Sequence, residues 1–590
     1  MTASVEPGTA SIFPTLTTTV AALAALGLLV GCGSSPADDE PTIDAARPDA
    51  AIAIDAGIDA PFPMVDPAID GRLVINEVMT ANALTVNDDT GAASDWIELY
   101  NPTDTALDLY GYALTDDLAT PRKSTLAPGT TIAAHGRLVL WADGEPAHGA
   151  RHLRFSLDSD GGDLALARPD GTFIDRLTYG KQETDFSAAR EPDGSDRWAI
   201  QWHPTPAAAN AAGTGQPMGL DDPTAPPEAV PAAGDLTDQL LGYDEVPELA
   251  ITVAPADVAR LDVDPRTYVP ATISFRGRAY GPVGLRLKGA NSFEPFGQKP
   301  SLRIHVNEYV DAARLFGLKN LTLNNMHSDF SMMHERLAYW IARGVGLPAS
   351  RCNHALLTVN GAFYGLYANV ETIKSSMMKR WFDGGDAPLF EATDVDFAPA
   401  YVPLFDLDDG PDDRTMLTGV ANAMTIADPD AALAAAAPYV DLDQFRRFWA
   451  FESLVAQLDA MPYSIPGDDY YVYADPTHKL SFIPSGIDES FYSAELDVTN
   501  VAGVLAVKCK ASPTCFQAYA NEVWRLQGIT ESMDLAGERV RIINRIAPYV
   551  AMDQRKSYPD SEVTNYQGQL YWFITERRFR LSSMIPPASP

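Results

Sequence analysis

Two stretches rich in alanine, proline and aspartate divide this chain into separate folding units. Residues 33–70 and about 204–240 show no helical or strand periodicity, and this composition is typical of flexible or semi-stiff linkers. One hydrophobic core therefore cannot extend across them. The chain has 590 residues, which is long enough for several domains, and the sequence predicts two folded units, at 71–203 and 241–585.

The charge balance limits the partners that this chain can bind. Lys and Arg number 43 and Asp and Glu number 79, which gives a net charge of −36. Nucleic-acid binding depends on cationic contacts with phosphates, and docking on anionic lipid depends on a basic face. We therefore expect no nucleic-acid partner. The charge suits a soluble, self-repelling protein in a cation-rich environment outside the cell.

The N-terminus carries an export signal. Residues 19–31 form a short apolar run of the length typical of a signal-peptide core. The run leads into LVGC at residues 29–32, which resembles a bacterial lipobox and implies cleavage before Cys32 with a lipid attached to it. We expect a lipoprotein signal peptide at 1–32, a disordered acidic tether at 33–70, and attachment to the outer membrane or cell surface through the lipid alone. A simple signal peptide with an incidental cysteine is the alternative.

The first unit reads as an all-β domain. Short runs of strand-forming residues lie at 73–78, 95–100, 137–141 and 163–167. Turn dipeptides such as Asn101-Pro102 and Pro128-Gly129 fall between them. Many short strands at this spacing predict a β-sandwich.

The same unit resembles a lamin tail domain. The resemblance is carried by INEV at 75–78, DWIELYNPT at 95–103, DLYGYALTD at 108–116 and SAAR at 187–190. It implies an immunoglobulin-like sandwich with an attachment or binding role beside an exported enzyme. The segment DSDGGD at 158–163 lacks the glutamate at position twelve of a calcium loop, so a β-turn is the better interpretation and the unit is expected to be non-catalytic.

The second unit begins with strands and ends with helices, which predicts an α+β fold. Its expected strands lie at 248–253, 269–275, 283–288, 301–306, 318–325, 469–473 and 480–484. An Asn-Gly turn at Asn360 and Gly361 predicts a hairpin. A helix is expected to follow a cap at Ser328 or Asp329, and further helices are expected at 445–458, 540–549 and 566–581.

This unit resembles the spore-coat protein H (CotH) kinase family. The matching blocks are VGLRLKGANS at 283–292, KPSLR at 299–303, LNN at 323–325, DFSMM at 329–333, NGAFYGLY at 360–367, DYYVY at 469–473 and FIPSGIDESF at 482–491. The resemblance implies an atypical, two-lobed protein-kinase-like fold. It also implies a protein serine/threonine kinase that uses ATP with Mg²⁺ or Mn²⁺ and acts on an exported protein or an envelope partner.

Phosphoryl transfer needs cations at the phosphates and carboxylates that hold a metal ion. The candidates for binding the cofactor are Lys288, Lys299, Arg303 and Glu371. Arg286 and Lys288 share one face of a strand because they are two positions apart. That shared face either lines a cleft or is solvated.

Three aspartates complete the candidate site. Asp488 follows a strand that reads as buried, which is a rigid position for a metal ligand, and Asp469 is the second metal candidate, with Asp468 as its alternative. Asp459 lies just beyond the long helix and is the candidate catalytic residue that orients or deprotonates the acceptor hydroxyl. A helix C-terminal residue exposed to solvent is the plainer interpretation of Asp459.

Several positions depart from the family pattern. Family members often carry Trp-Asp-Gly-Tyr where this chain has LDAM at 458–461, and two asparagines where it has Asp468 and Asp469. These departures keep two alternatives open: a pseudokinase that serves as a surface binding protein, and nucleotidyl transfer on the same fold. No GxxxxGK[ST] loop is present in the sequence, which excludes a P-loop enzyme.

Three further cysteines remain. Cys509 and Cys515 bracket the five residues KASPT, and export permits a disulfide between them. Cys352 is then left over, and it reads as a small buried side chain.

Overall fold

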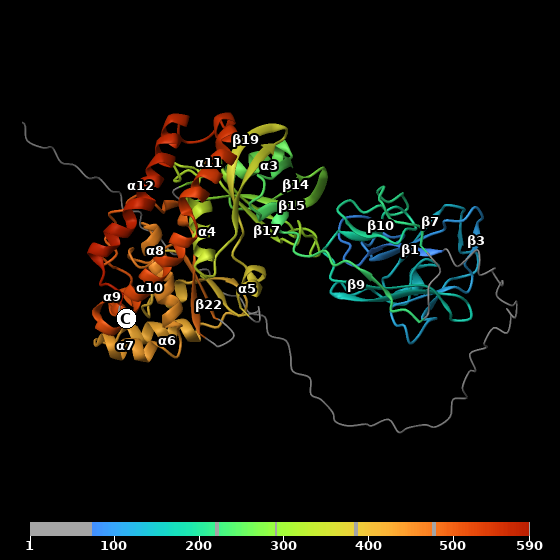
Figure 1. Ribbon diagram of the computed structural model, residues 1–590, viewed down its shortest axis with the longest axis horizontal. Helices are drawn as coiled ribbons and strands as arrows, with labels where there is room; N and C mark the ends of the chain where they lie inside the picture. Colours follow the sequence, from blue (N-terminus) through green and yellow to red (C-terminus); the bar gives the residue numbers. More distant parts are fainter. Residues whose placement is uncertain (1–72, 219–223, 290–291, 383–386, 475–478, 589–590) are drawn as a thin grey trace, which may run out of the picture. The chain divides into compact units, whose positions relative to one another are not determined.

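The computed structural model describes residues 73–218, 224–289, 292–382, 387–474 and 479–588 (Figure 1). The predicted signal peptide and tether, with the lipid site at Cys32, lie outside these residues.

The first unit is a β-sandwich, as the sequence predicts. One five-stranded sheet has the order β11-β10-β1-β2-β7, and the other has the order β12-β9-β8-β4-β5. Leucine, isoleucine and tyrosine side chains from both sheets form the core between them. The first sheet contains β1 (Val74–Met79), β2 (Trp96–Tyr100), β7 (Arg137–Trp141), β10 (Ser187–Arg190) and β11 (Trp198–Gln201). The second contains β4 (Ala113–Thr115), β5 (Ser124–Thr125), β8 (Gly161–Ala167), β9 (Phe173–Gly180) and β12 (Glu228–Val230), and β3 (Leu107–Asp108) pairs with β6 (Thr131–Ile132).

Strand β12 lies inside the segment that the sequence predicts to be a linker, 204–240. It pairs in parallel with β9, with Glu228 opposite Leu177. The Glu228 carboxylate also accepts a hydrogen bond of 2.8 Å from Nη2 of Arg190, whose side chain is fully buried. Part of this proline- and alanine-rich segment is therefore a strand at the edge of the sandwich.

The second unit begins with a closed barrel of seven strands in the order β13-β14-β15-β16-β17-β19-β18. The strands are β13 (Glu248–Val253), β14 (Val269–Phe275), β15 (Arg278–Lys288), β16 (Ser301–His305), β17 (Asn320–Asn324), β18 (Cys352–Val359) and β19 (Ala362–Val370). The parallel pairing of β13 with β18 closes the barrel, and Asn360 and Gly361 form the predicted turn between β18 and β19. Leu285 and Leu287 of β15 are fully buried in the barrel core, so the alternate residues Arg286 and Lys288 project from its other face.

A four-stranded antiparallel sheet and a group of helices form the rest of this unit. The sheet has the order β21-β20-β22-β23 and contains β20 (Leu389–Ala392), β21 (Asp406–Asp409), β22 (Tyr470–Ala474) and β23 (Leu480–Pro484). The helices are α4 (His334–Gly344), α5 (Ser375–Trp381), α6 (Thr415–Met424), α7 (Pro429–Ala436), α8 (Leu442–Val455), α9 (Val504–Ala511), α10 (Pro513–Ser532), α11 (Leu535–Met552) and α12 (Asp560–Met584). Trp449 of α8 stacks on Tyr519 of α10, with ring centroids 3.6 Å apart.

Several helices differ from the sequence prediction. Helix α4 begins at His334, four residues later than a cap at Asp329 would place it, although Oδ2 of Asp329 accepts a hydrogen bond of 2.6 Å from the His334 amide. Helices α5, α6, α7, α9 and α10 lie in segments for which the sequence analysis proposes no helix.

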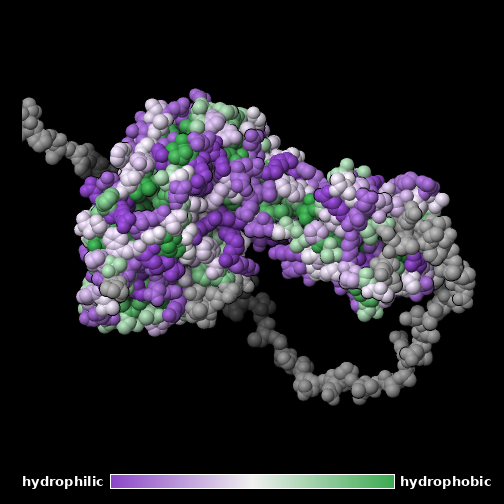
Figure 2. Space-filling view, in the orientation of Figure 1, coloured by the Kyte–Doolittle hydropathy of each residue, from purple (hydrophilic) through white to green (hydrophobic). Residues whose placement is uncertain are grey.

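Within the described residues, no helix is at once long enough and apolar enough to span a bilayer. Hydrophilic side chains predominate on the face shown in Figure 2, in keeping with the net charge of −36.

Cys509 and Cys515 form a disulfide that joins the end of α9 to the start of α10. Their sequence separation is 6, and closing a loop of this size stabilises a fold by about 2 kcal/mol.

We expect the double variant Cys509→Ser, Cys515→Ser to have a free energy of unfolding lower by about 2 kcal/mol, measured by urea denaturation. Reductant should lower the parent to the level of the variant and leave the variant unchanged. Equal midpoints for the variant and the oxidised parent would contradict the prediction.

Candidate active site

A cavity of about 480 Å³ lies in the second unit, within the range of about 300–1,000 Å³ typical of small-molecule sites. Its walls come from strands β15, β16 and β17 of the barrel, from helix α4, and from strands β20 and β22 with the turn after β23. Most of the lining residues are polar or charged. Such a lining is suited to a polar, ionised ligand.

Cationic side chains on β15 and β16 form one wall of the cavity. Arg286 and Lys288 of β15 both line it, together with Arg303 of β16. Arg286 lies directly opposite Arg303 in the strand register, and like charges in this position destabilise a sheet. The Nε of Arg303 is buried without a hydrogen-bond partner. A bound anion would relieve both of these unfavourable features.

Lys288 reaches across the cavity through a chain of hydrogen bonds. Its Nζ donates to Oδ1 of Asn324 at 2.7 Å, and Nδ2 of Asn324 donates to Oε1 of Glu335 at 2.7 Å. Burial lowers the pKa of Lys288, and the negative charges of Glu335 and Asp488 act in the opposite direction. Burial is the largest cause that raises the pKa of Glu335 to about 8, and the negative charge of Asp488 adds to this effect. The chain joins the barrel to helix α4.

Two aspartates predicted as metal ligands lie in the same cavity, Asp469 and Asp488. Burial is the largest cause that raises the pKa of Asp488 to about 7, with further contributions from the charges of Asp329 and Glu489. Burial also raises the pKa of Asp469 well above its ordinary value, and the charge of Asp488 adds to this effect. The cavity therefore concentrates carboxylates that repel one another when ionised.

The backbone near Asp469 is specialised. Asp469 has φ of 58°, a left-handed conformation that non-glycine residues seldom adopt outside functional or turn positions. A Cβ atom at Gly486 would lie 2.0 Å from Oδ1 of Asp469. Only glycine at position 486 leaves room for the carboxylate of Asp469 in its present place.

The donor atoms in the cavity suit a magnesium or manganese ion. Mg²⁺ prefers oxygen ligands and is usually held by one or two carboxylates together with substrate phosphates. Asp469 and Asp488 supply two carboxylates, and Oε2 of Glu335 is buried without a partner. A cation here would offset the mutual repulsion of these groups.

Asp459, the predicted catalytic residue, is exposed and is not among the residues that line the cavity. Its side chain forms a hydrogen bond with Glu489, and its charge raises the pKa of Asp469 after larger contributions from burial, Asp488 and Asp468. Asp459 therefore lies close to the carboxylates of Glu489 and Asp469, and its side chain is accessible to solvent. Its catalytic role stays a prediction.

Two predicted cofactor ligands have partners of their own. Glu371 touches the cavity, but its carboxylate is paired with Arg351 and Arg380. Although burial raises its pKa, these two arginines outweigh burial and leave it below the ordinary value.

Lys299 is not among the lining residues. Its buried Nζ lies 2.7 Å from Oδ2 of Asp553, which also accepts the Leu366 amide at 3.0 Å. This arrangement ties the segment before β16 to the end of α11.

Asn324 and Glu335 also belong to the site, and neither is among the site residues predicted from the sequence. Glu335 is 2% exposed, in the first turn of α4. It precedes Tyr339 by four positions and so shares a helical face with this buried aromatic residue. An acidic residue on an otherwise apolar helical face is the feature of the sequence that could have identified Glu335 as a site residue.

Two family models match the two folded units of the chain. Residues 285–584 match the family model described as CotH kinase protein, and residues 67–181 match that of the Lamin Tail Domain. Among solved structures, the chain matches the Helicobacter pylori proinflammatory kinase CtkA with 9% identity and a TM-score of 0.21, over 50% of this chain and 91% of that one. It also matches the complex of HipA, HipB and operator DNA from the Shewanella oneidensis MR-1 toxin–antitoxin system, with 12% identity and a TM-score of 0.22, over 60% and 76%. None of the curated proteins compared with the chain matches it.

The pairing of Lys299 with Asp553 predicts a structural role for this lysine. The variant Lys299→Met leaves a buried carboxylate without its cation, and we expect the free energy of unfolding to fall by about 3 kcal/mol. Nucleotide affinity, measured by calorimetry below the unfolding temperature, should change little, whereas Arg303→Met should weaken it. A large loss of affinity in the stably folded Lys299→Met protein would contradict this assignment.

The raised pKa of Glu335 predicts a pH-dependent stability. The folded protein holds a proton on this group up to about pH 8, whereas an unshifted glutamate loses it near 4.5. Stability of the metal-free protein should therefore fall as pH rises between these values.

The variant Glu335→Gln keeps an acceptor for Asn324 but cannot ionise, so its melting temperature should fall less between pH 5 and pH 8 than that of the parent. Exposed Glu562 provides the control variant Glu562→Gln, which should follow the parent. Parallel melting curves for Glu335→Gln and the parent would refute the prediction.

Proposed function

The chain belongs to the CotH kinase family, and from this membership and the cavity geometry we propose that it is an exported protein kinase. The γ-phosphoryl group of ATP passes to a serine or threonine hydroxyl of an exported or envelope protein. The bond between the γ-phosphorus and the bridging oxygen breaks, and a bond from the hydroxyl oxygen to that phosphorus forms. ADP leaves, and the hydroxyl proton passes to a nearby carboxylate.

One observation carries this proposal. A cationic wall made of Arg286, Lys288 and Arg303 and the carboxylates of Asp469 and Asp488 line one cavity. Phosphoryl transfer requires this combination, because the enzyme mainly positions phosphates and stabilises their charge. The unpartnered Nε of Arg303 is available to a phosphate oxygen.

Each group has a distinct task in the proposed reaction. Arg286 and Arg303 bind the outer phosphates, and Lys288 is oriented toward them by Asn324. Asp469 and Asp488 hold Mg²⁺ or Mn²⁺, which supplies positive charge to the phosphate oxygens. Asp459 is exposed, where a protein substrate has access, and it accepts the hydroxyl proton.

The proposal includes export and a lipid anchor at Cys32. The disulfide between Cys509 and Cys515 supports an oxidising compartment, because such bonds are rare in the cytosol. The lipobox-like residues at 29–32 support anchoring in the cell envelope.

The second candidate function is partner binding without turnover. The absence of Asp459 from the residues that line the cavity favours it, because a catalytic base must reach the acceptor hydroxyl beside the phosphates. In this case the family fold would serve as a surface for an envelope partner.

A transfer assay on the full chain separates these functions. We expect radiolabel from γ-labelled ATP to appear on protein with Mg²⁺ or Mn²⁺, and the variants Asp488→Asn and Lys288→Met to reduce it by at least about 100-fold, the scale expected for groups that stabilise transition-state charge. The control variants Asp406→Asn and Lys379→Ala change exposed residues and should retain activity.

The outcomes discriminate sharply. Label from α-labelled ATP, with AMP retained on protein, would replace the kinase proposal with nucleotidyl transfer. No label from either nucleotide, in a folded protein that binds ATP, would favour the binding function. Label that persists in Asp488→Asn would remove this aspartate from the site.

A further inference from the structure

The sandwich unit contains a second group of chemically reactive side chains, unrelated to the cavity. They lie on the segment that follows strand β7. The Trp141 amide donates to Arg151 at 2.8 Å and the Leu153 amide donates to Trp141 at 2.7 Å. A short 3₁₀ helix, Pro146–His148, lies between these contacts. Backbone hydrogen bonds thus hold the far end of the segment, at Arg151 and Leu153, against Trp141 at the end of β7.

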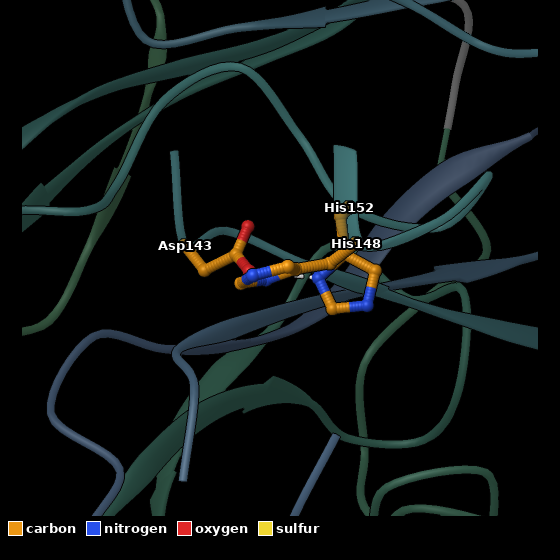
Figure 3. Close-up of side chains that lie close together, drawn as sticks. All are labelled: Asp143, His148 and His152. Carbon is orange, nitrogen blue, oxygen red and sulfur yellow. Dashed lines mark hydrogen bonds and ion pairs between the residues drawn. The ribbon is translucent and has the colours of Figure 1, made fainter. Parts of the chain in front are cut away.

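Two histidines of this segment converge on one carboxylate (Figure 3). Oδ2 of Asp143 lies 3.0 Å from Nδ1 of His148 and 2.7 Å from Nδ1 of His152. The candidate ligand atoms of the three residues all lie within 4.8 Å of one another. Two ligands bonded to Zn²⁺ at about 2.0–2.1 Å in a tetrahedral site are about 3.3 Å apart. The donor atoms are therefore already close to the spacing that a metal ion requires.

The three side chains differ in exposure in a way that suits a metal site. The His152 side chain is fully buried, that of Asp143 is 11% exposed, and that of His148 is 44% exposed. The cluster is therefore open to solvent on the side of His148, and a water molecule or a side chain of a partner can take the fourth coordination position there.

The two ring nitrogens of His152 have different surroundings. Its Nδ1 contacts Asp143, and its Nε2 is buried without a partner. A metal ion bound to Nδ1 would leave the ring proton on Nε2, so the metal ion uses the nitrogen that already faces the carboxylate. The convergence of the three ligand atoms, and not the unpartnered Nε2, is therefore the feature that supports the site.

We propose that Asp143, His148 and His152 form a binding site for a divalent transition metal ion, with Zn²⁺ the best fit. Two imidazole nitrogens and one carboxylate oxygen match the ligands that Zn²⁺ takes in sites with one open position. Mg²⁺ and Ca²⁺ take oxygen ligands instead. The ion joins the two ends of the 143–152 segment to each other. The proposal does not depend on the kinase activity.

The test uses the full chain, stripped of metal and kept in excess Mg²⁺ to occupy oxygen-rich sites. Titration with ZnCl₂ in a calorimeter should show one tight site in the parent. The variant His148→Gln removes an accessible ligand, and its affinity for Zn²⁺ should fall by at least about 10-fold, as expected when a metal site loses a supporting group. The variant His135→Gln is the matched control, because His135 is also exposed and pairs with a single aspartate, Asp104, at 2.9 Å.

X-ray absorption of the zinc-loaded parent provides a second measurement that does not depend on the folding of a variant. Two imidazole nitrogens at about 2.0–2.1 Å, one of them lost in His148→Gln, would support the site. Equal zinc affinity in the parent and His148→Gln, or a zinc environment made only of oxygen and sulfur, would overturn the proposal.

Discussion

The hydrogen-bonded chain from Lys288 through Asn324 to Glu335 is the interaction on which the cavity depends. It crosses from the barrel to helix α4, so a carboxylate on the helix helps to fix the position of a cation on the barrel. Burial disfavours the charged form of both end groups. The charge of Lys288 and the charge of Glu335 favour one another's ionised form. The hydrogen-bonded chain between them therefore links the β15 wall of the cavity to its α4 wall.

The carboxylates around this chain exceed the cations that face them. Asp469 and Asp488 both have raised pKa values, with burial as the largest cause. Protons and a divalent cation are two ways to relieve the same repulsion, and they compete for the same oxygens. Gly486 makes this crowding possible, because any side chain there would meet the carboxylate of Asp469. The departure of this chain from paired asparagines at 468 and 469 therefore changes the charge of the cavity, and with it the cation that suits the site.

Local patterns predicted much of the fold, and contacts between distant segments account for what they missed. The alternation of Leu285 and Leu287 with Arg286 and Lys288 places cations on the cavity face of β15, because a strand has a period of two. No such pattern reveals that Lys299 pairs with Asp553, which is 254 positions away. A lysine near a phosphate site and a lysine in a structural ion pair look alike in sequence. The sequence predicts a linker where strand β12 lies, because a three-residue edge strand is defined by its partner, β9, and not by its own residues.

The donor atoms of the two sites predict that they take different metal ions. The cavity offers carboxylate oxygens from Asp469 and Asp488, whereas the segment after β7 offers two imidazole nitrogens and one carboxylate. Oxygen donors suit Mg²⁺ and Mn²⁺, and imidazole suits Zn²⁺. A net charge of −36 attracts cations of every kind to the chain and so cannot by itself distinguish them. The type of ligand atom can distinguish them, and it would keep a metal ion used in the proposed reaction apart from one bound at the segment after β7.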